Sequence, residues 1–171
     1  MSYSRISSPR VLPIAMFLTL IMFFTNLALH AKGPPSDACV MLPADQLAKV
    51  LEQPFGPATK TVAPSAFSGS PTGTDCTFRT EKGLQRQLLF RIYVESSPAA
   101  AKETFNKLSA YYGPNTVVTG NWDNAYLDAV HAIHVQKGNV RYYLNLNPIG
   151  PDAAKTEKQV KDLATLIAGQ L

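Results

Sequence analysis

The first 31 residues limit what the rest of this chain can fold into. Arg5 and Arg10 occur before any acidic residue, and the stretch from Val11 to Ala31 is almost entirely apolar. A short basic region followed by an apolar run is the order found in secretory signal peptides. Removing this segment leaves 140 residues, which suffice for one domain with its own core but not for two ordinary domains. We therefore predict a linker at 32–37 and a single extracytoplasmic domain at 38–171.

The export segment has two possible fates. Leu29-His30-Ala31 ends in a small residue where a signal peptidase would cut. Alternatively, about 20 apolar residues can cross a bilayer as a helix, so residues 11–31 can remain as a membrane anchor. The arginines keep the N-terminus inside in both cases, and the domain then faces out. The flanking residues favour a cleaved signal peptide, which predicts a secreted or periplasmic protein; retention of the segment would tether it to the membrane.

The two cysteines, Cys39 and Cys76, both lie after the export segment. An oxidising compartment allows such a pair to close, and we predict a disulfide bond. In the chain-entropy model, closing a loop of this length stabilises the fold by about 4 kcal/mol. The alternative, a reactive thiol pair, lacks the Cys-x-x-Cys spacing of a redox site.

The charge of the domain is close to balanced. The export segment contains two of the 16 basic residues and none of the 12 acidic ones, so the remainder has 14 basic against 12 acidic residues and a net charge of +2. Proteins that bind nucleic acid carry clustered basic surfaces. The sequence therefore predicts no nucleic-acid partner.

The order of apolar patterns after the linker predicts an α+β domain. Pro43 fits the first position of a helix that ends before Pro54, and Ser97-Pro98 fits the start of another that Gly113 ends. The expected strands lie at 59–62, 76–80, 87–95, 133–135 and 140–146, and a last helix contains Val160 to Ile167. Tight turns between strands and single helices between strand groups indicate an antiparallel sheet of about five strands with helices packed on one face. The export helix would precede this domain.

Two of these strands alternate cleanly and predict two different sheet faces. The expected core face contains Leu88, Phe90, Ile92 and Val94 with Val140, Tyr142, Leu144 and Leu146. The opposite face contains Arg91, Tyr93, Arg141, Tyr143, Asn145 and Asn147, and it is either a solvated surface or a recognition surface. Trp122, in a polar loop, either packs back on the core or meets a partner. The candidate binding surface is therefore Arg91, Tyr93, Trp122, Arg141 and Tyr143.

The sequence contains few residues with the spacing of a catalytic or metal site. His131 and His134 lie near Asp128, but residues three apart in a strand point to opposite faces. Asp123 and Asp128 are best explained as solvated acids, and neither a Gly-x-Ser-x-Gly motif nor a phosphate-binding glycine loop occurs. We therefore predict no catalytic, cofactor-binding or metal-ligating residue and no cofactor. The alternative is an envelope hydrolase that uses His131 or His134 with Asp128.

Three short motifs resemble a known group of proteins. They are Ala38-Cys39 with Leu42, Ala44 and Leu47, then Cys76-Thr-Phe, then Gly120-Asn-Trp-Asp-Asn-Ala125-Tyr126. Over residues 38–170 the chain resembles small exported α+β domains of unknown function found in bacterial lipoproteins and in extracellular parts of envelope sensors. The chain has Trp122 where that pattern usually has a second glycine, and Ser36-Asp37-Ala38 is not a lipobox, so Cys39 is not expected to carry lipid.

This resemblance implies a non-catalytic domain that faces the cell envelope. With the residue patterns above, it predicts an exported ligand- or protein-binding module. The expected partner is a small molecule, a lipid or an envelope protein, and the membrane is contacted only through residues 11–31 if they are not removed.

Overall fold

The computed structural model of the chain describes residues 36–113 and 115–171. The predicted export segment, at 1–31, lies outside these residues. Within the described part of the chain, no helix combines the length and the hydropathy that a membrane span requires.

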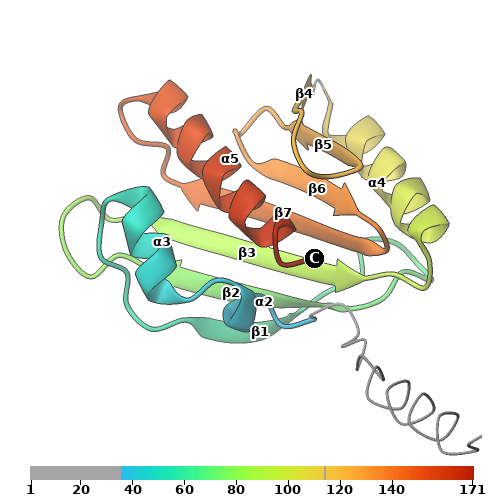
Figure 1. Ribbon diagram of the computed structural model, residues 1–171, viewed down its shortest axis with the longest axis horizontal. Coiled ribbons are helices and arrows are strands. Elements are labelled where there is room, and N and C mark those ends of the chain that lie inside the picture. Colours follow the sequence, from blue (N-terminus) through green and yellow to red (C-terminus); the bar gives the residue numbers. More distant parts are fainter. Residues whose placement is uncertain (1–35, 114) are drawn as a thin grey trace, which may run out of the picture. The chain divides into compact units, whose positions relative to one another are not determined.

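Seven antiparallel strands form one sheet in the order β1-β2-β3-β7-β6-β5-β4 (Figure 1). The strands are β1 (Thr59–Ala63), β2 (Gly73–Arg79), β3 (Gln87–Val94), β4 (Thr116–Val117), β5 (Asn124–Leu127), β6 (Ile133–Lys137) and β7 (Val140–Asn147). The α+β class and the antiparallel pairing are confirmed, but the predicted number of about five strands is too small. The two strands that the sequence pattern missed, β4 and β5, contain only two and four residues, which is too short for an alternating pattern to stand out.

Within residues 36–113 and 115–171, four helices accompany the sheet: α2 (Ala38–Met41), α3 (Ala44–Leu51), α4 (Pro98–Tyr112) and α5 (Ala153–Ala168). The side chain of Ser97 accepts a hydrogen bond from the backbone N–H of Ala100 at 3.1 Å, which confirms Ser97-Pro98 as the start of α4. Asp152 caps α5 in the same way through the N–H of Lys155. Side-chain acceptors at these positions satisfy N–H groups that have no partner within the helix.

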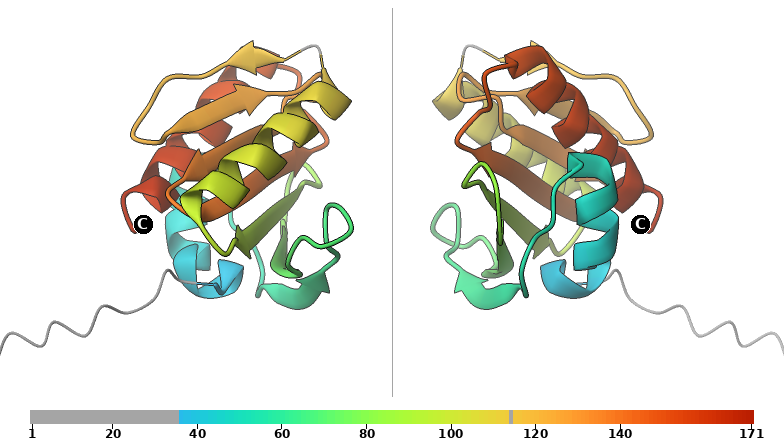
Figure 2. Two further views of the ribbon diagram at one scale, coloured as in Figure 1. Left: turned by 90° about the vertical axis from the view of Figure 1, so that its right-hand side faces the viewer. Right: turned by 90° about the vertical axis from the view of Figure 1, so that its left-hand side faces the viewer.

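The helices lie on both faces of the sheet, so the prediction that they pack on one face is wrong. Figure 2 shows α4 and α5 on opposite sides. The phenol of Tyr142 donates a hydrogen bond to the carbonyl of Ala164 in α5 at 2.7 Å. Phe105 of α4 packs instead against Tyr126. The strand register places Tyr126 on the same face as Tyr143, the residue that follows Tyr142 in β7. Successive residues of a strand point to opposite faces. The Ala-rich α4 has only a weak apolar stripe, so the sequence did not show that it covers a second face.

The core lies between the sheet and the helices α2, α3 and α5. Its strand residues are those that the alternation predicts, including Leu88, Phe90, Ile92, Val140, Leu144 and Leu146, and each is nearly fully buried. Val160, Leu163 and Ile167 of α5 complete this layer. The predicted core face of β3 and β7 is thus confirmed, except that Val94 at the end of β3 is only partly buried.

The predicted disulfide is present between Cys39 in α2 and Cys76 in β2. Their Cα atoms lie 5.2 Å apart, within the range that a disulfide spans. The bond joins α2 to the core face of the sheet, next to Phe90 of β3 in the strand register. It closes a loop between residues 37 positions apart in the sequence.

Candidate ligand cavity on the outer sheet face

The candidate site is built on one row of residues that crosses the sheet on the α4 side. Neighbouring strands place these residues directly opposite one another, and cross-strand neighbours of this kind lie about 5 Å apart. In order across the sheet, the row contains Thr61, Asp75, Arg91, Tyr143, His134, Tyr126 and Val117. A second row on the same face places Tyr93 opposite Arg141. This face on the α4 side, called the outer face below, is therefore polar and aromatic, whereas the core face is mainly apolar.

Arg91 forms a bidentate ion pair with Asp75 on the neighbouring strand. Its Nε and Nη2 donate to the two carboxylate oxygens at 2.6 and 2.7 Å. The hydrogen bond with Asp75 raises the pKa of Arg91 above its usual value. Because both oxygens of Asp75 are engaged, the charge of Arg91 is already neutralised within the protein.

Arg141 is paired as well, and it is almost completely buried. Its Nε and Nη2 donate to one oxygen of Glu95 at 2.8 and 2.6 Å, and the two side chains are each 4% exposed. The guanidinium carbon lies 4.7 Å from the centre of the Tyr93 ring, a favourable cation–π distance. Burial raises the pKa of Tyr93, so that residue stays protonated at neutral pH.

His134 lies at the centre of an aromatic cluster. Its ring stacks on Tyr126 with centroids 4.5 Å apart, and the rings of Tyr143 and Tyr112 lie at 4.7 and 5.2 Å. The Nε2 atom of His134 lies 3.1 Å from Asp128 Oδ2. Burial acts to raise the pKa of Asp128, but hydrogen bonds from His134 and from the backbone N–H groups of Ala132 and Val130 outweigh it, and the net pKa is lowered.

A cavity of about 500 Å³ opens above these residues. The sheet supplies its floor, with Arg91, Tyr93, His134, Arg141 and Tyr143. One wall comes from α4, through Phe105, Leu108, Tyr111 and Tyr112, and the opposite wall from residues 64–67. The phenol of Tyr93 donates a hydrogen bond to the carbonyl of Pro64 at 2.8 Å and fastens this second wall to the sheet. The volume is within the range of small-molecule sites.

Four of the five predicted surface residues meet at this cavity. Arg91, Tyr93, Arg141 and Tyr143 all line it. The face is not open to solvent, however: α4 and residues 64–67 cover it, so Tyr93 and Arg141 are buried. Replacing Arg141 therefore disturbs the fold as well as any binding surface.

Trp122 does not line this cavity. Its Nε1 donates to the carbonyl of Val118 at 3.0 Å, and the ring packs against the edge of the core. A Cβ atom on Gly120 would lie 2.3 Å from the ring, so glycine is required there for the indole to lie flat against the loop. Between the two roles expected for Trp122, this geometry matches packing against the core.

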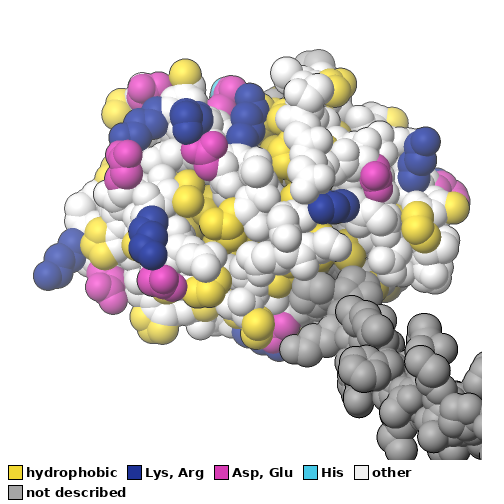
Figure 3. Space-filling view, in the orientation of Figure 1, with side chains coloured by type: hydrophobic (Ala, Val, Ile, Leu, Met, Phe, Trp, Pro, Cys, Tyr) yellow, Lys and Arg dark blue, Asp and Glu magenta, His cyan; other side chains and the backbone are white. Residues whose placement is uncertain are grey.

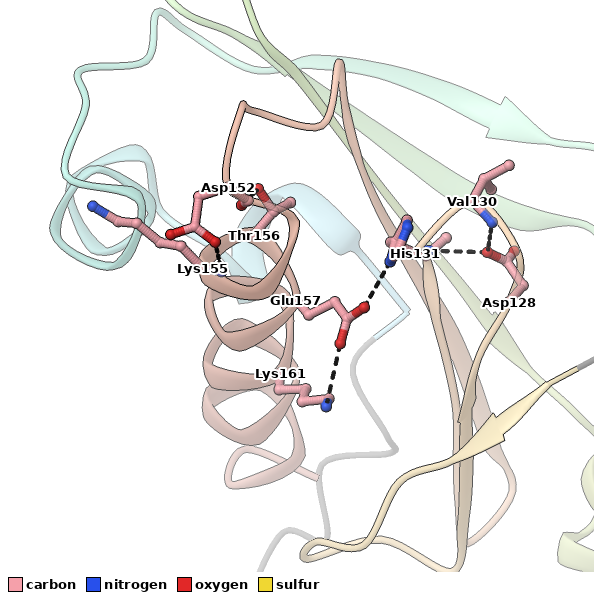
Figure 4. A network of polar contacts seen from close by, with 9 residues as sticks. Asp128, Val130, His131, Asp152, Lys155, Thr156, Glu157 and Lys161 are labelled. Carbon is pink, nitrogen blue, oxygen red and sulfur yellow. Dashed lines mark hydrogen bonds and ion pairs between the residues drawn. The ribbon is translucent and has the colours of Figure 1, made fainter.

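The two histidines face different parts of the molecule. His131 has a positive φ of 60° and lies in the turn before β6 rather than in a strand. Its Nδ1 lies 2.7 Å from Glu157 of α5, which also pairs with Lys161 (Figure 4). His134 lies on the opposite face under α4. The two rings therefore cannot share an ion, and of the pair only His134 reaches the cavity.

Asp123 and Asp128 do not form a carboxylate pair. Asp123 accepts hydrogen bonds from the backbone of Gly138 and the side chain of Gln136, at 2.7 and 3.1 Å, and so holds the turn between β6 and β7. Asp128 is bonded to His134 and to the backbone of its own turn. No group of three or more metal-ligating side chains was found among the residues that the structure describes.

Sequence reasoning missed the covering parts of the site. Neither Tyr112 nor residues 64–67, which form the two walls of the cavity, are among the predicted surface residues. The pairing of Asp75 with Arg91 follows directly from the strand register, so a correct register would have indicated it. No protein-family model matches the sequence, and the comparison with curated proteins gives no match.

Proposed function

We propose that this chain is an exported binding module that holds an uncharged small molecule in the cavity between α4 and the outer sheet face. The observation that carries the proposal is the combination of aromatic walls with arginines that already have carboxylate partners. Tyr93, Tyr111, Tyr112 and Tyr143 line the cavity together with Phe67 and Phe105. Aromatic side chains provide large contact areas at low entropic cost and dominate many binding sites.

The charge state of the cavity argues for a neutral ligand. Arg91 is neutralised by Asp75 and Arg141 by Glu95. A ligand that brought a net charge into this half-buried space would lose hydration without gaining a free counter-charge on the floor. A flat or amphipathic molecule would instead stack on the tyrosines and hydrogen bond to their hydroxyl groups. We therefore favour a small molecule over a protein partner.

Replacing the exposed aromatic wall tests this proposal. Tyr111 and Tyr112 are 77% and 44% exposed, so the double change Tyr111→Ala and Tyr112→Ala should leave the fold intact. Nile red, a neutral aromatic dye, serves as the probe. We expect the wild-type protein to bind it with increased fluorescence and the double variant to bind it at least about tenfold more weakly, since each lost aromatic contact is worth about 1 kcal/mol.

The matched control is Lys102→Ala, a change at an exposed position of α4 that does not line the cavity. It should bind the dye as the wild type does. Equal binding by the wild type and the Tyr111 and Tyr112 double variant would contradict the proposed site.

The second candidate function is a hydrolase that uses His134 with Asp128. The supporting observation is their 3.1 Å contact, with His134 on the cavity floor, because a carboxylate that orients a histidine is part of many nucleophilic and acid–base sites. Such an enzyme would need a water or a hydroxyl group that His134 could activate. Ester hydrolysis by the wild type that disappears in His134→Gln, with the dye still bound, would favour this function over simple binding.

We also propose that the domain acts outside the cytoplasm. The disulfide between Cys39 and Cys76 is compatible with an extracellular location, and the basic and apolar N-terminal sequence agrees with export. Mass spectrometry of the protein recovered from cells would give the mature N-terminus. A start after Ala31 would support cleavage and a start at Met1 would support a membrane anchor, while recovery of the reduced protein from the cytoplasm would contradict export.

A further inference from the structure

A second hollow lies at the other side of the sheet, where α5 begins, and it contains a buried arginine. Arg86, just before β3, is 8% exposed. Its backbone is fixed by Thr80, whose hydroxyl accepts from the Arg86 N–H at 2.9 Å and whose N–H donates to the Arg86 carbonyl at 3.0 Å. These two bonds fix the backbone from which the buried side chain extends.

Arg86 differs from Arg91 and Arg141 because no carboxylate in the described part of the chain pairs with it. No acidic side chain of residues 36–113 or 115–171 forms an ion pair with it. Its Nη2 donates to the hydroxyl of Thr156 at 3.2 Å, and its Nε is buried without a hydrogen-bond partner. Burial lowers the pKa of this guanidinium, but an arginine remains charged. A buried cation without a counter-charge is costly.

The surroundings of Arg86 fit a small anion. The hollow measures about 520 Å³ and is also lined by Lys82, Lys155, Thr156 and Gln159. Figure 4 shows Asp152, Lys155 and Thr156 at the first turn of α5, where the helix dipole favours negative charge. Asp152 already caps that turn and Lys155 pairs with Glu52 at 2.6 Å. Among the described residues that line the hollow, the cations without an ion-pair partner are therefore Arg86 and Lys82.

The acceptor atoms of the hollow favour phosphate among the small anions. The Oε1 atom of Gln159 is buried without a partner and needs a hydrogen-bond donor. Inorganic phosphate at neutral pH retains a hydroxyl group that can donate, and its oxygens match the fork of a guanidinium. On the side of the molecule that carries α3 and α5, basic and acidic side chains are interspersed (Figure 3), so a general positive surface does not explain the site.

We propose that the hollow beside the start of α5 binds inorganic phosphate through the guanidinium of Arg86. The hydroxyl of Thr156 orients this guanidinium, and Gln159 accepts from the phosphate hydroxyl. This site is independent of the cavity under α4, which lies on the opposite sheet face.

The test is the thermal stability of the full-length protein in phosphate and in chloride at equal ionic strength. A ligand that binds only the folded state raises the melting temperature. We expect a rise of roughly 3 to 6 °C at phosphate ten times above the Kd, and no rise for Arg86→Met. The control Arg79→Met removes an exposed charge outside the hollow and should respond as the wild type does. An equal rise in Arg86→Met, or none in the wild type, would overturn the proposal.

Two further arms identify the ligand. Glycerol phosphate tests a phosphate monoester, which has largely lost its ionisable hydroxyl at neutral pH; a rise equal to or larger than that with inorganic phosphate would overturn the role of Gln159 and assign the site to monoesters. Sulfate lacks a hydroxyl at neutral pH, so it should stabilise the protein less than phosphate; an equal effect would overturn the role of Gln159. If Arg86→Met does not fold, the Nε–H resonance of Arg86 in the wild type decides the proposal, because binding shifts it and an unchanged signal at saturating phosphate contradicts the site.

Discussion

The two faces of the sheet bury side chains of different kinds. The face under α5 packs aliphatic and aromatic side chains such as Phe90, Leu144 and Leu163, which are almost fully buried. The face under α4 buries charged groups, among them Arg141 and Glu95, each with an internal partner. One face thus derives its stability from apolar area removed from water, while the other retains polar groups and a cavity. The α5 face thus supplies most of the apolar core, and the α4 face contains the cavity of the proposed function.

The largest effect is expected from opening a void in the apolar core on the α5 face of the sheet. Phe90→Ala removes a ring that is fully buried between β3 and the helices, and we expect a loss of about 4 kcal/mol in the free energy of unfolding. Urea denaturation measures it. The comparison variant, Tyr111→Ala on the α4 side, removes an exposed ring and should cost less than about 0.5 kcal/mol. Similar losses in both variants would mean that the two faces do not differ in this way.

The next largest effect concerns the buried ion pair on the α4 side. Arg141→Met leaves the Glu95 carboxylate buried and unpaired, so we expect a loss of about 3 kcal/mol in the same assay. The double change Arg141→Met and Glu95→Leu removes both charges and should recover most of that loss. A double variant no more stable than Arg141→Met would show that the pair itself, and not the stranded charge, stabilises the fold.

The smallest effect is expected from pH. The pKa of Asp128 is lowered below its ordinary value of 3.8, although burial alone would raise it, because His134 and two backbone N–H groups donate to the carboxylate. A lowered folded-state pKa stabilises the protein above the ordinary value, and this contribution is lost as the pH falls through the folded-state pKa. The stability difference between the wild type and Asp128→Asn should therefore be present at pH 7 and shrink below about pH 4. A difference that does not change between pH 7 and pH 3 would contradict this assignment.

The parts of the fold that could be predicted are those in which a residue pattern has a single physical explanation. Alternation identified the core residues of β3 and β7 because burial of one sheet face imposes a period of two. The disulfide followed from two cysteines in a chain whose sequence predicts export. By contrast, β4 and β5 are too short to show a pattern, and the weak apolar stripe of α4 did not indicate which face it covers.

The candidate site was predictable in its floor but not in its walls or its charge. Arg91, Tyr93, Arg141 and Tyr143 were assigned correctly to one face, since side-chain direction follows from the strand pattern. The two arginines form ion pairs with Asp75 and Glu95. These partners could be identified only if the register between the strands were known. Single-strand patterns contain no information about register between distant segments, so the neutral character of the cavity was visible only in the fold.

The disulfide also determines how the domain would respond to mechanical tension. Cys39 is near the start of the domain and Cys76 lies in β2, inside the sheet. A pull on the N-terminal side of the chain would pass through the sulfur atoms directly to β2. The segment between the two cysteines, which contains the end of α2 and all of α3 and β1, would bear no load. If residues 11–31 hold the protein at a membrane, shear at the cell surface would therefore act on the sheet and could not peel these elements from it one by one.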